Sequence, residues 1–321
     1  MGSRRYLLRK TLQAVVTLWF VLTFNFFLFR ILPGDPVAVL ARSEKLTADD
    51  IARLQHELGL DRPMLAQYVV YMRETLSGNL GESLRTAEEV TSMIGERMWP
   101  TVLLVGLGTV LASWFGIVIG IRGGWRRGSR FDTGSQYGSL ILYSMPEGWL
   151  GMLLLLVFSG LLGWFPAGGY ETGGLTGVSR MVDILDHLFL PLLTLTLGYI
   201  GGYAIVMRSS MIDTTHEDFV QTARSKGVPE RTVRKRHVVP NAFLPTFTLI
   251  FLSFGFVLGG AIVIETVYSW PGLGLLTYNA IRTLDYPVIQ GVFLVTSAAV
   301  IVANLAADVA YGYLDPRIKQ A

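Results

Sequence analysis

Residues 218–245 read DFVQTARSKGVPERTVRKRHVVPNAFLP, and this stretch decides the fold of the chain. It is polar and strongly basic, and it lies between two apolar runs without charged side chains. We expect a first short helix that runs to Lys226 and stops at Gly227, because glycine most readily takes the left-handed conformation that closes a helix. A second helix should start near Pro229, a favoured first helical residue, and end before Pro240. A polar helical hairpin between two membrane spans predicts a docking surface for a cytoplasmic partner.

The composition of the whole chain is that of an integral membrane protein. Of its 321 residues, 51% are hydrophobic and only 16% are charged. A helix of about twenty apolar residues crosses a hydrocarbon core roughly 30 Å thick. Six such runs are present: Thr11–Phe29, Thr101–Ile121, a long one within Thr133–Phe165, Leu188–Met207, Phe243–Ile264 and Val288–Ala307. The sequence therefore predicts an all-α protein with six transmembrane helices, the first of which is a retained anchor.

The placement of Lys and Arg predicts the orientation, because these residues gather on the cytoplasmic side. The short loops on the other side hold only Arg180 and Arg282, and the long segment between the first two spans is of mixed charge and says little about orientation. The cytoplasmic set is Arg4, Arg5, Arg9, Lys10, Arg122, Arg126, Arg127, Arg130, the seven basic residues from Arg208 to Arg236, Arg317 and Lys319. Both termini and the 218–245 stretch are therefore expected in the cytoplasm. The net charge of +3 follows from this asymmetry and does not indicate nucleic-acid binding. The chain has no cysteine, which excludes disulfide and thiol chemistry.

An external segment, residues 33–97, has a helical pattern of its own. Thr47 and Asp50 form a loose capping box before a helix that Gly59 stops. Pro63 opens a second helix that runs to Leu76, with glycine soon after it. Two interpretations stay open: a small cap that packs on the spans, or a platform for an external partner.

Two other local features stand out in the spans. Gly116–Gly120 and Gly255–Gly259 are small-x3-small pairs, which let helices approach closely. Glu147 is the only charged residue in the third run, and Pro146 directly before it should kink the span there. Fourteen residues from Thr133 put it about 20 Å along a helix, past the middle of the membrane. A carboxylate there must be paired or must face water. It is either a structural residue with a partner or a pathway residue that attracts a substrate amine.

Enzyme chemistry has no basis in this sequence. No phosphate-binding G-x-x-x-x-G-K-[ST] and no nucleophile G-x-S-x-G occurs. His56-Glu57 lacks the second histidine of a metalloprotease helix, and the other histidines are scattered. We therefore expect no catalytic residue and no metal site, which leaves an intramembrane enzyme without support.

Several motifs in a fixed order resemble one family along essentially the whole chain. They are Leu32-Pro-Gly-Asp-Pro36, Glu57-Leu-Gly-Leu-Asp61, Gly78-Asn-Leu-Gly-Glu-Ser-Leu84, Phe158-Ser159, Leu162-Gly-Trp-Phe-Pro166, Ser269-Trp-Pro-Gly-Leu-Gly274, Asp285-Tyr-Pro287 and Leu314-Asp-Pro-Arg317. Ala223 and Gly227, in an Ala-x3-Gly spacing followed by Pro240, complete the pattern. The chain resembles the first permease subunit of bacterial dipeptide and oligopeptide ABC importers.

The resemblance implies a type I ABC importer permease that forms half of a translocation pathway for peptides delivered by an external binding protein. Its partners would be a homologous second permease in a heterodimer, two ABC ATPase subunits and the binding protein, in the cell membrane of a bacterium or archaeon. ATP and Mg would bind to the ATPases, and this chain would hold no cofactor. Nickel-chelate importers share the architecture. A proton-coupled secondary transporter using Glu147 is the rival from another class, but no inverted repeat supports it.

The resemblance also assigns roles to individual residues. Residues 214–241 would be the coupling hairpin, with ATPase contacts from Gln221, Ala223, Arg224, Lys226, Gly227, Arg231 and Pro240. Gln221 stands where the general importer motif has glutamate. Arg234, Lys235 and Arg236 would either join these contacts or anchor the chain at anionic lipid. On the outer face, Trp270, Pro271, Gly272 and Gly274 would dock the binding protein together with the cap. The expected divisions are residues 1–97 (anchor and cap), 98–313 (five-span transmembrane domain) and 314–321 (tail).

Overall fold

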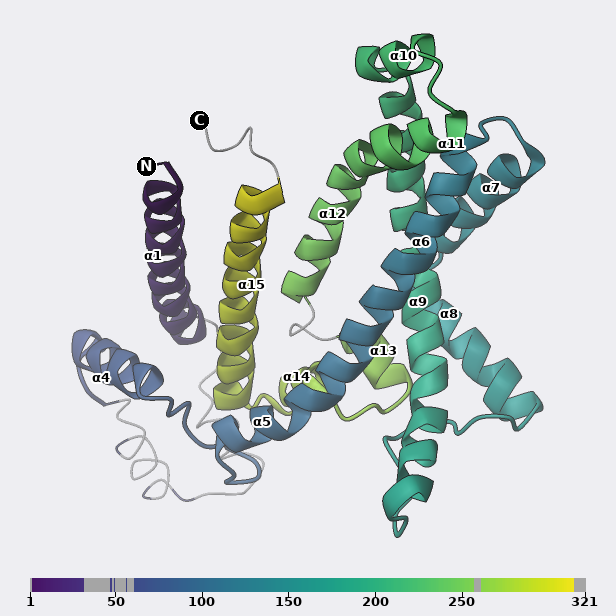
Figure 1. Cartoon of the computed structure of the whole chain (residues 1–321). Coiled ribbons are helices and arrows are strands. Elements are labelled where there is room, and N and C mark those ends of the chain that lie inside the picture. Colours follow the sequence, from purple (N-terminus) through teal and green to yellow (C-terminus); the bar gives the residue numbers. More distant parts are fainter. Residues whose placement is uncertain are drawn as a thin grey trace. The chain divides into compact units, whose positions relative to one another are not determined.

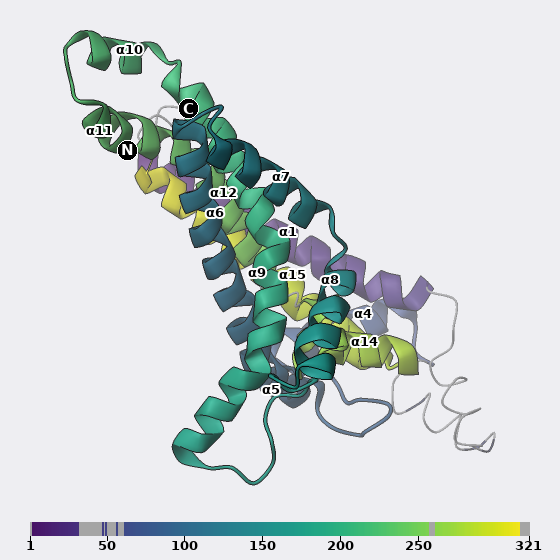
Figure 2. The same cartoon turned by 90° about the vertical axis from the view of Figure 1, so that its right-hand side faces the viewer.

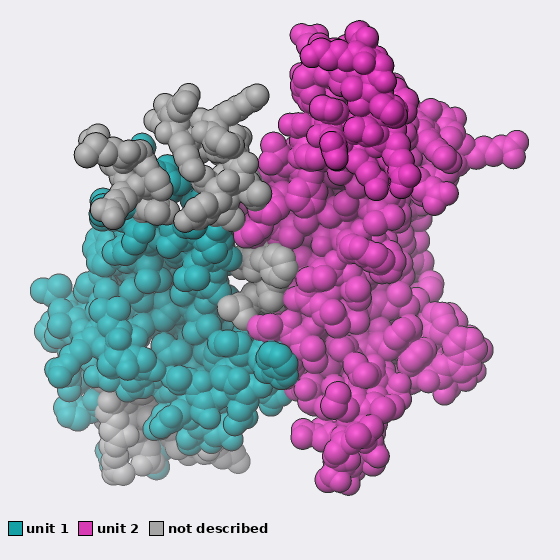
Figure 3. Space-filling model, viewed as in Figure 1, with its two compact units in different colours: residues 1–99, 272–321 teal, residues 100–271 magenta. Residues whose placement is uncertain are grey.

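The computed structural model describes residues 2–31, 47, 49, 56, 61–256 and 261–314. Every regular element in these ranges is a helix, and an isolated bridge between Glu82 and Glu89 is the only β feature within them. The all-α prediction is thus confirmed. Contacts divide the chain into two compact units, residues 1–99 with 272–321 (unit 1) and residues 100–271 (unit 2) (Figure 1, Figure 3). The divisions expected from the sequence, 1–97, 98–313 and 314–321, stay a prediction.

Four described helices are long and apolar enough to cross a membrane, and a bent helix pair would make five. The four are Leu8–Arg30, Val90–Trp125, Gly177–Thr215 and Tyr286–Val309. The predicted fifth run, Phe243–Ile264, includes residues 257–260, which lie outside the described ranges. The count of six spans therefore stays a prediction.

Unit 1 is built on two antiparallel helices, α1 (Gly2–Ile31) and α15 (Tyr286–Leu314). Lys10 Nζ near the start of α1 lies 3.0 Å from Asp308 Oδ2 near the end of α15. The beginning of α1 and the end of α15 consequently lie at the same end of this unit, as Figure 1 shows.

The core of unit 1 lies where α15 meets α5 (Val90–Thr101) and α14 (Leu273–Thr283). Its buried side chains are Val90, Ile94, Leu273, Ala280, Val288 and Val292. The helix predicted after Pro63 is present as α4 (Met64–Leu76), with Pro63 as the residue before its first turn. The other predicted cap helix, before Gly59, lies outside the described ranges apart from isolated residues.

Two motifs that are distant in sequence meet in unit 1. The Asp285 carboxylate accepts hydrogen bonds from the Ser83 hydroxyl at 2.5 Å and from the Leu84 backbone N–H at 3.1 Å. The guanidinium of Arg85 donates to the Thr283 carbonyl at 3.1 and 3.0 Å. Asp285 is 4% exposed, so these bonds satisfy a buried carboxylate. They fix the cap to the segment before the last span.

Unit 2 is organised around α6 (Leu107–Trp125) and α9 (Gly177–Thr215), which lie side by side in Figure 1 and Figure 2. Glycines on α6 allow this close approach. A Cβ added at Gly116 would lie 2.9 Å from the Ile200 carbonyl oxygen, and one at Gly120 would lie 2.8 Å from that of Ala204. The packing predicted for Gly116–Gly120 is confirmed, whereas Gly255–Gly259 extends outside the described ranges.

This contact predicts a large cost for Gly120→Val. The new side chain would collide with backbone of α9 that cannot rotate away, and overpacking typically costs about 1–3 kcal/mol or more. We expect the free energy of unfolding of the purified chain in detergent to fall by at least that amount. Gly134→Val is the matched control, because Gly134 is also helical but has nothing within 4 Å of its added Cβ. Equal losses in both variants would contradict the close packing.

The third predicted run is a broken helix rather than one long span. α7 (Arg130–Ser144) ends before Pro146, and α8 (Glu147–Leu154) continues as a π-helical segment, Leu155–Leu161, at an angle of 100° to α7. Met145 is extended (φ −76°, ψ 130°), as expected for a residue before proline. Pro146 was expected only to kink the span, so the placement of Glu147 about 20 Å along one helix was wrong. It is the first residue of the second half, after the bend.

The hairpin continues directly into the next long helix. α10 (Asp218–Ser225) is followed by α11 (Glu230–Thr232), a π-helical segment (Val233–Val238) and α12 (Val239–Phe256), without a break after α11. The prediction that the second helix ends before Pro240 was wrong. The wider π turns directly before Pro240 leave room for its ring, and they do not need the N–H that proline lacks. The helix can therefore continue through Pro240.

Candidate functional site

The hairpin's first helix is closed by a complete left-handed cap. Gly227 has φ +75°, in the region that favours glycine. Its N–H donates to the Arg224 carbonyl at 2.9 Å, and the Val228 N–H donates to the Ala223 carbonyl at 3.2 Å. These two bonds satisfy carbonyls that the helix end leaves without partners. The predicted helix-closing role of Gly227 is confirmed, with Lys226 as the capping residue after Ser225.

The hairpin packs on the end of α9 as a single element. Val220 and Ala223 of α10 are 0% and 7% exposed, and they face Met207 and Met211 of α9. The buried cluster consists of Met207, Met211, Val220, Ala223, Val233, Val238 and Ala242. Figure 2 shows α10 and α11 gathered at one end of unit 2, beside the ends of α6 and α9. A force on the hairpin would therefore be passed to α9 through a close-packed apolar core.

An ion pair ties α10 to α11 across the bend. Arg224 Nε lies 2.9 Å from Glu230 Oε1, and Arg224 Nη2 donates to Glu230 Oε2 at 3.4 Å. Both side chains are partly exposed, so the pair contributes about 1 kcal/mol or less. It links the two helices across the bend at Gly227.

The other predicted contact residues lie on the surface of the hairpin. Gln221, Lys226, Arg231 and Pro240 are exposed, and so is the ring of Phe219, at 41%. Ala223 differs from them, since its methyl group is buried within the chain itself. The exposed residues give the hairpin a surface of mixed basic, amide and aromatic side chains, and Ala223 belongs to the core beneath it.

The three consecutive basic residues in the π-helical segment before α12 do not share one environment. The guanidinium of Arg234 lies over the ring of Trp125, 5.9 Å from its centroid. Lys235 and Arg236 are exposed. Arg234 thus packs within unit 2, while Lys235 and Arg236 are free for lipid or for a partner.

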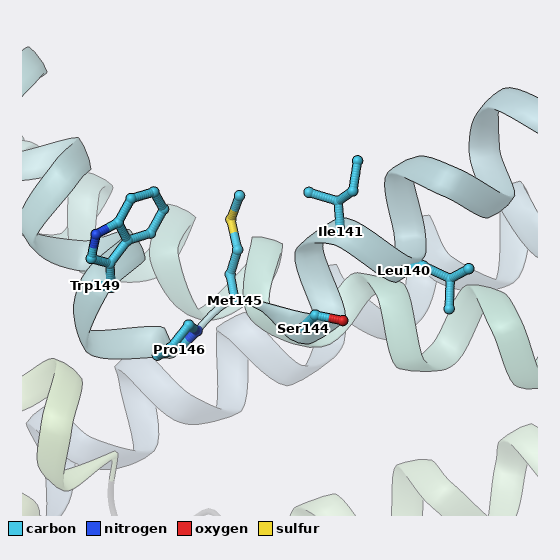
Figure 4. A pocket seen from close by; sticks show the side chains of 6 residues that line it. All are labelled: Leu140, Ile141, Ser144, Met145, Pro146 and Trp149. Atoms are coloured by element: carbon cyan, nitrogen blue, oxygen red, sulfur yellow. The ribbon is translucent and has the colours of Figure 1, made fainter.

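Glu147 is half-buried and turned toward α9. Its carboxylate interacts with the Tyr199 hydroxyl of α9. The nearby hollow at the helix break is lined by Leu140, Ile141, Ser144, Met145, Pro146 and Trp149, as Figure 4 shows. Glu147 is not among these lining residues. The arrangement favours the structural interpretation, in which a partner satisfies the carboxylate.

The outer segment around Trp270 is largely buried within the chain. Trp270 is 0% exposed, its Nε1–H donates to the Pro100 carbonyl at 2.9 Å, and its ring packs on Tyr170. Gly272 and Gly274 are also buried, and Pro271 is half-buried. Burial within the chain gives Trp270, Gly272 and Gly274 a packing role after the end of α13 (Ile262–Val267), and docking of the binding protein at these residues stays a prediction.

Two buried charged sites escaped sequence reasoning. Glu265 of α13 is 0% exposed, and it accepts a hydrogen bond from the Thr101 hydroxyl at 3.0 Å. Asp132 is paired with Arg208, which lies 76 residues further along the chain. The one available signal was the position of Glu265 directly after an apolar run. Among the described residues, no group of three or more acidic, histidine or cysteine side chains could hold a metal ion.

Comparison with known proteins connects this geometry to a family. Residues 112–320 match the family described as binding-protein-dependent transport system inner membrane component, and residues 3–105 match the N-terminal region of the same kind of membrane component. A Brucella suis protein that carries the name of a peptide permease is 42% identical, with 98% of this chain and 99% of that protein covered.

Other relatives cover equally much of the chain. The di/tripeptide transport system permease protein of Pseudomonas aeruginosa is 36% identical, with 98% of both chains covered. The oligopeptide transport system permease protein of Bacillus subtilis is 34% identical, with 98% of this chain and 99% of that protein covered. The chain therefore belongs to the family of inner membrane components of binding-protein-dependent transport systems.

Proposed function

We propose that this chain is a permease subunit through which an ATP-driven importer moves peptides. Its relatives are named for di- and tripeptide and oligopeptide transport, and one from Salmonella, 37% identical, is named for glutathione transport. These names agree on short peptide-like solutes. The chain belongs to a family of membrane components and has apolar helices long enough to span a bilayer, so the substrate would pass through the membrane beside these helices.

The observation that carries this proposal is the construction of the hairpin. A self-contained carrier has no need for a capped, close-packed helical pair that exposes basic and amide side chains at the end of its central helices. Such an element is suited to a partner that pushes on it. We assign residues 214–241 as the coupling hairpin and place ATP, Mg and hydrolysis on two partner ATPase chains, with no cofactor in this one.

The remaining architecture follows from this assignment. The chain would have six spans with both termini cytoplasmic, and it would pair with a homologous second permease to enclose the pathway. An external binding protein would deliver substrate at the opposite face. The location would be the cell membrane of a bacterium or archaeon. The proximity of the start of α1 and the end of α15 supports placing both termini on one side.

Reconstitution of the complete importer tests the function directly. The chain would be co-produced with its neighbouring permease, ATPases and binding protein, and uptake of labelled di-, tri- and oligopeptides and glutathione would be measured in proteoliposomes. We expect uptake that requires both ATP and the binding protein. Uptake driven by a proton gradient without ATP would support the secondary transporter instead, and uptake of nickel chelates alone would reject peptides as substrates.

Glu147 offers a second test, on the substrate pathway. Glu147→Gln keeps a polar partner for Tyr199, so we expect uptake within about twofold of the parent. Glu147→Ala leaves the Tyr199 hydroxyl without that partner and should lower the free energy of unfolding by about 1–3 kcal/mol. Uptake of a free-amine peptide and of its N-acetylated form should change equally. A selective loss of free-amine peptides in Glu147→Gln would make the carboxylate a pathway residue.

A further inference from the structure

An ion pair with a buried carboxylate joins α7 to the same end of α9 that carries the hairpin. Arg208 Nε lies 2.5 Å from Asp132 Oδ1, and Arg208 Nη2 donates to Asp132 Oδ2 at 2.9 Å. The Asp132 side chain is 3% exposed and that of Arg208 is 21% exposed. The Gly128 N–H also donates to Asp132 Oδ2 at 2.9 Å. This is a two-point, charge-assisted contact with little freedom to slide.

The surroundings of the pair make it a junction of three helices. A Cβ added at Gly123 of α6 would lie 3.2 Å from Asp132 Oδ1, and one at Gly124 would lie 2.8 Å from the Arg208 carbonyl. The two glycines therefore bring the backbone of α6 against the pair. Anchoring at lipid does not explain Arg208, because lipid contact would not require a buried carboxylate from another helix.

The neighbouring residues of α9 contact the hairpin instead of α7. Met207 and Met211 lie before and after Arg208, and both are fully buried in the hairpin cluster with Val220 and Ala223. The last turns of α9 therefore contact the hairpin through apolar side chains and α7 through one ion pair. Of the described polar contacts between α7 and α9, this pair is the one with two charged partners.

The break after α7 gives the pair a mechanical role. α7 and α8 meet at an angle of 100°, so they do not form one continuous helix. α7 can therefore change position without moving α8 by the same amount. Glu147 at the start of α8 interacts with Tyr199, earlier on α9. Each half of the broken span is thus held to α9 by its own polar contact, and only the half nearer the hairpin is held by an ion pair.

We propose that Asp132 and Arg208 are a positioning pair that transmits displacement of the coupling hairpin to α7 during transport. This inference rests on the proposed importer function. When partner ATPases move the hairpin, the end of α9 moves with it through the methionine contacts. The two-point ion pair then carries α7 along, so that the α7 half of the broken span changes position with each ATP cycle.

The test uses the complete importer in proteoliposomes with Arg208→Gln. We expect basal ATP hydrolysis to stay within about twofold of the parent and uptake per ATP hydrolysed to fall about tenfold or more. Arg130→Gln is the matched control, because it removes an exposed positive charge at the start of α7. Asp132→Asn should reproduce the effect of Arg208→Gln. If both Arg208→Gln and Asp132→Asn keep the parent's uptake per ATP, the pair does not transmit movement.

A distance measurement separates transmission from a merely structural role. The chain has no cysteine, so single cysteines at exposed Tyr137 of α7 and His216 after α9 take spin labels specifically in an importer whose other subunits are made cysteine-free. In the parent the distance between the labels should be the same with and without ATP, because α7 follows α9. In Arg208→Gln it should differ between these states. An unchanged distance in Arg208→Gln overturns the proposal, whereas a parent complex without any uptake would instead reject the importer function.

Discussion

An importer that carries Gly227→Val is expected to insert and assemble normally but to lose substrate-stimulated ATP hydrolysis and uptake, by about tenfold or more. Gly227 adopts φ +75°, where a β-branched residue is strained, by about 1–2 kcal/mol or more. To relieve that strain the chain must leave the left-handed region, which breaks the bonds from Gly227 and Val228 to the end of α10. The second helix would then turn away from the first, and the Arg224–Glu230 pair would separate.

Two further variants identify the cause of that loss. Gly227→Asn should keep most activity, because asparagine tolerates the left-handed conformation better than other non-glycine residues. Gly174→Val introduces the same kind of strain at φ +88°, outside the hairpin and with open space around the added Cβ. We expect it to transport normally. Uptake is measured in proteoliposomes and assembly by co-purification, and normal uptake by Gly227→Val would show that the hairpin is not the coupling element.

The parts of the fold that the sequence predicted well depend on local chemistry. Gly227 as a helix stop, Pro63 before a helix that ends at Leu76, and the close approach at Gly116 and Gly120 all follow from what one residue type does to its own backbone or to the nearest helix. Apolar run lengths located the long helices for the same reason. Membrane-spanning helices are easier to locate from sequence than helices of soluble proteins, because the thickness of the bilayer fixes their length.

The parts that were missed depend on partners distant in sequence. Pro240 looked like a stop, but π turns before it keep the helix continuous. Pro146 was expected to kink a span, and the structure shows a 100° break, which changes what Glu147 faces. The Asp132–Arg208 pair joins residues 76 positions apart, and no local pattern marks it. Burial of Trp270 was hidden for the same reason, since its partners Pro100 and Tyr170 lie far away in the chain.

Trp270→Ala is expected to be among the most destabilising single changes in this chain. The ring is 0% exposed, and it belongs to a cluster with Leu104, Leu188 and Tyr268. Replacing a buried aromatic side chain with alanine typically costs about 3–5 kcal/mol. The change also leaves the Pro100 carbonyl without its indole donor, at about 1 kcal/mol or more. We expect the free energy of unfolding in detergent to fall by about 4 kcal/mol, or the protein to be absent from the membrane fraction.

Trp149→Ala is the control for this loss, because Trp149 is 49% exposed and removal of its ring leaves no cavity of comparable size. It should change the free energy of unfolding by about 1 kcal/mol or less. The comparison also decides what the outer segment does. A docking residue would leave the isolated chain stable and weaken only the binding protein's contact, whereas a core residue weakens the chain before any partner is added. If Trp270→Ala is as stable as the parent and loses only contact with the binding protein, Trp270 is a docking residue and not a core residue.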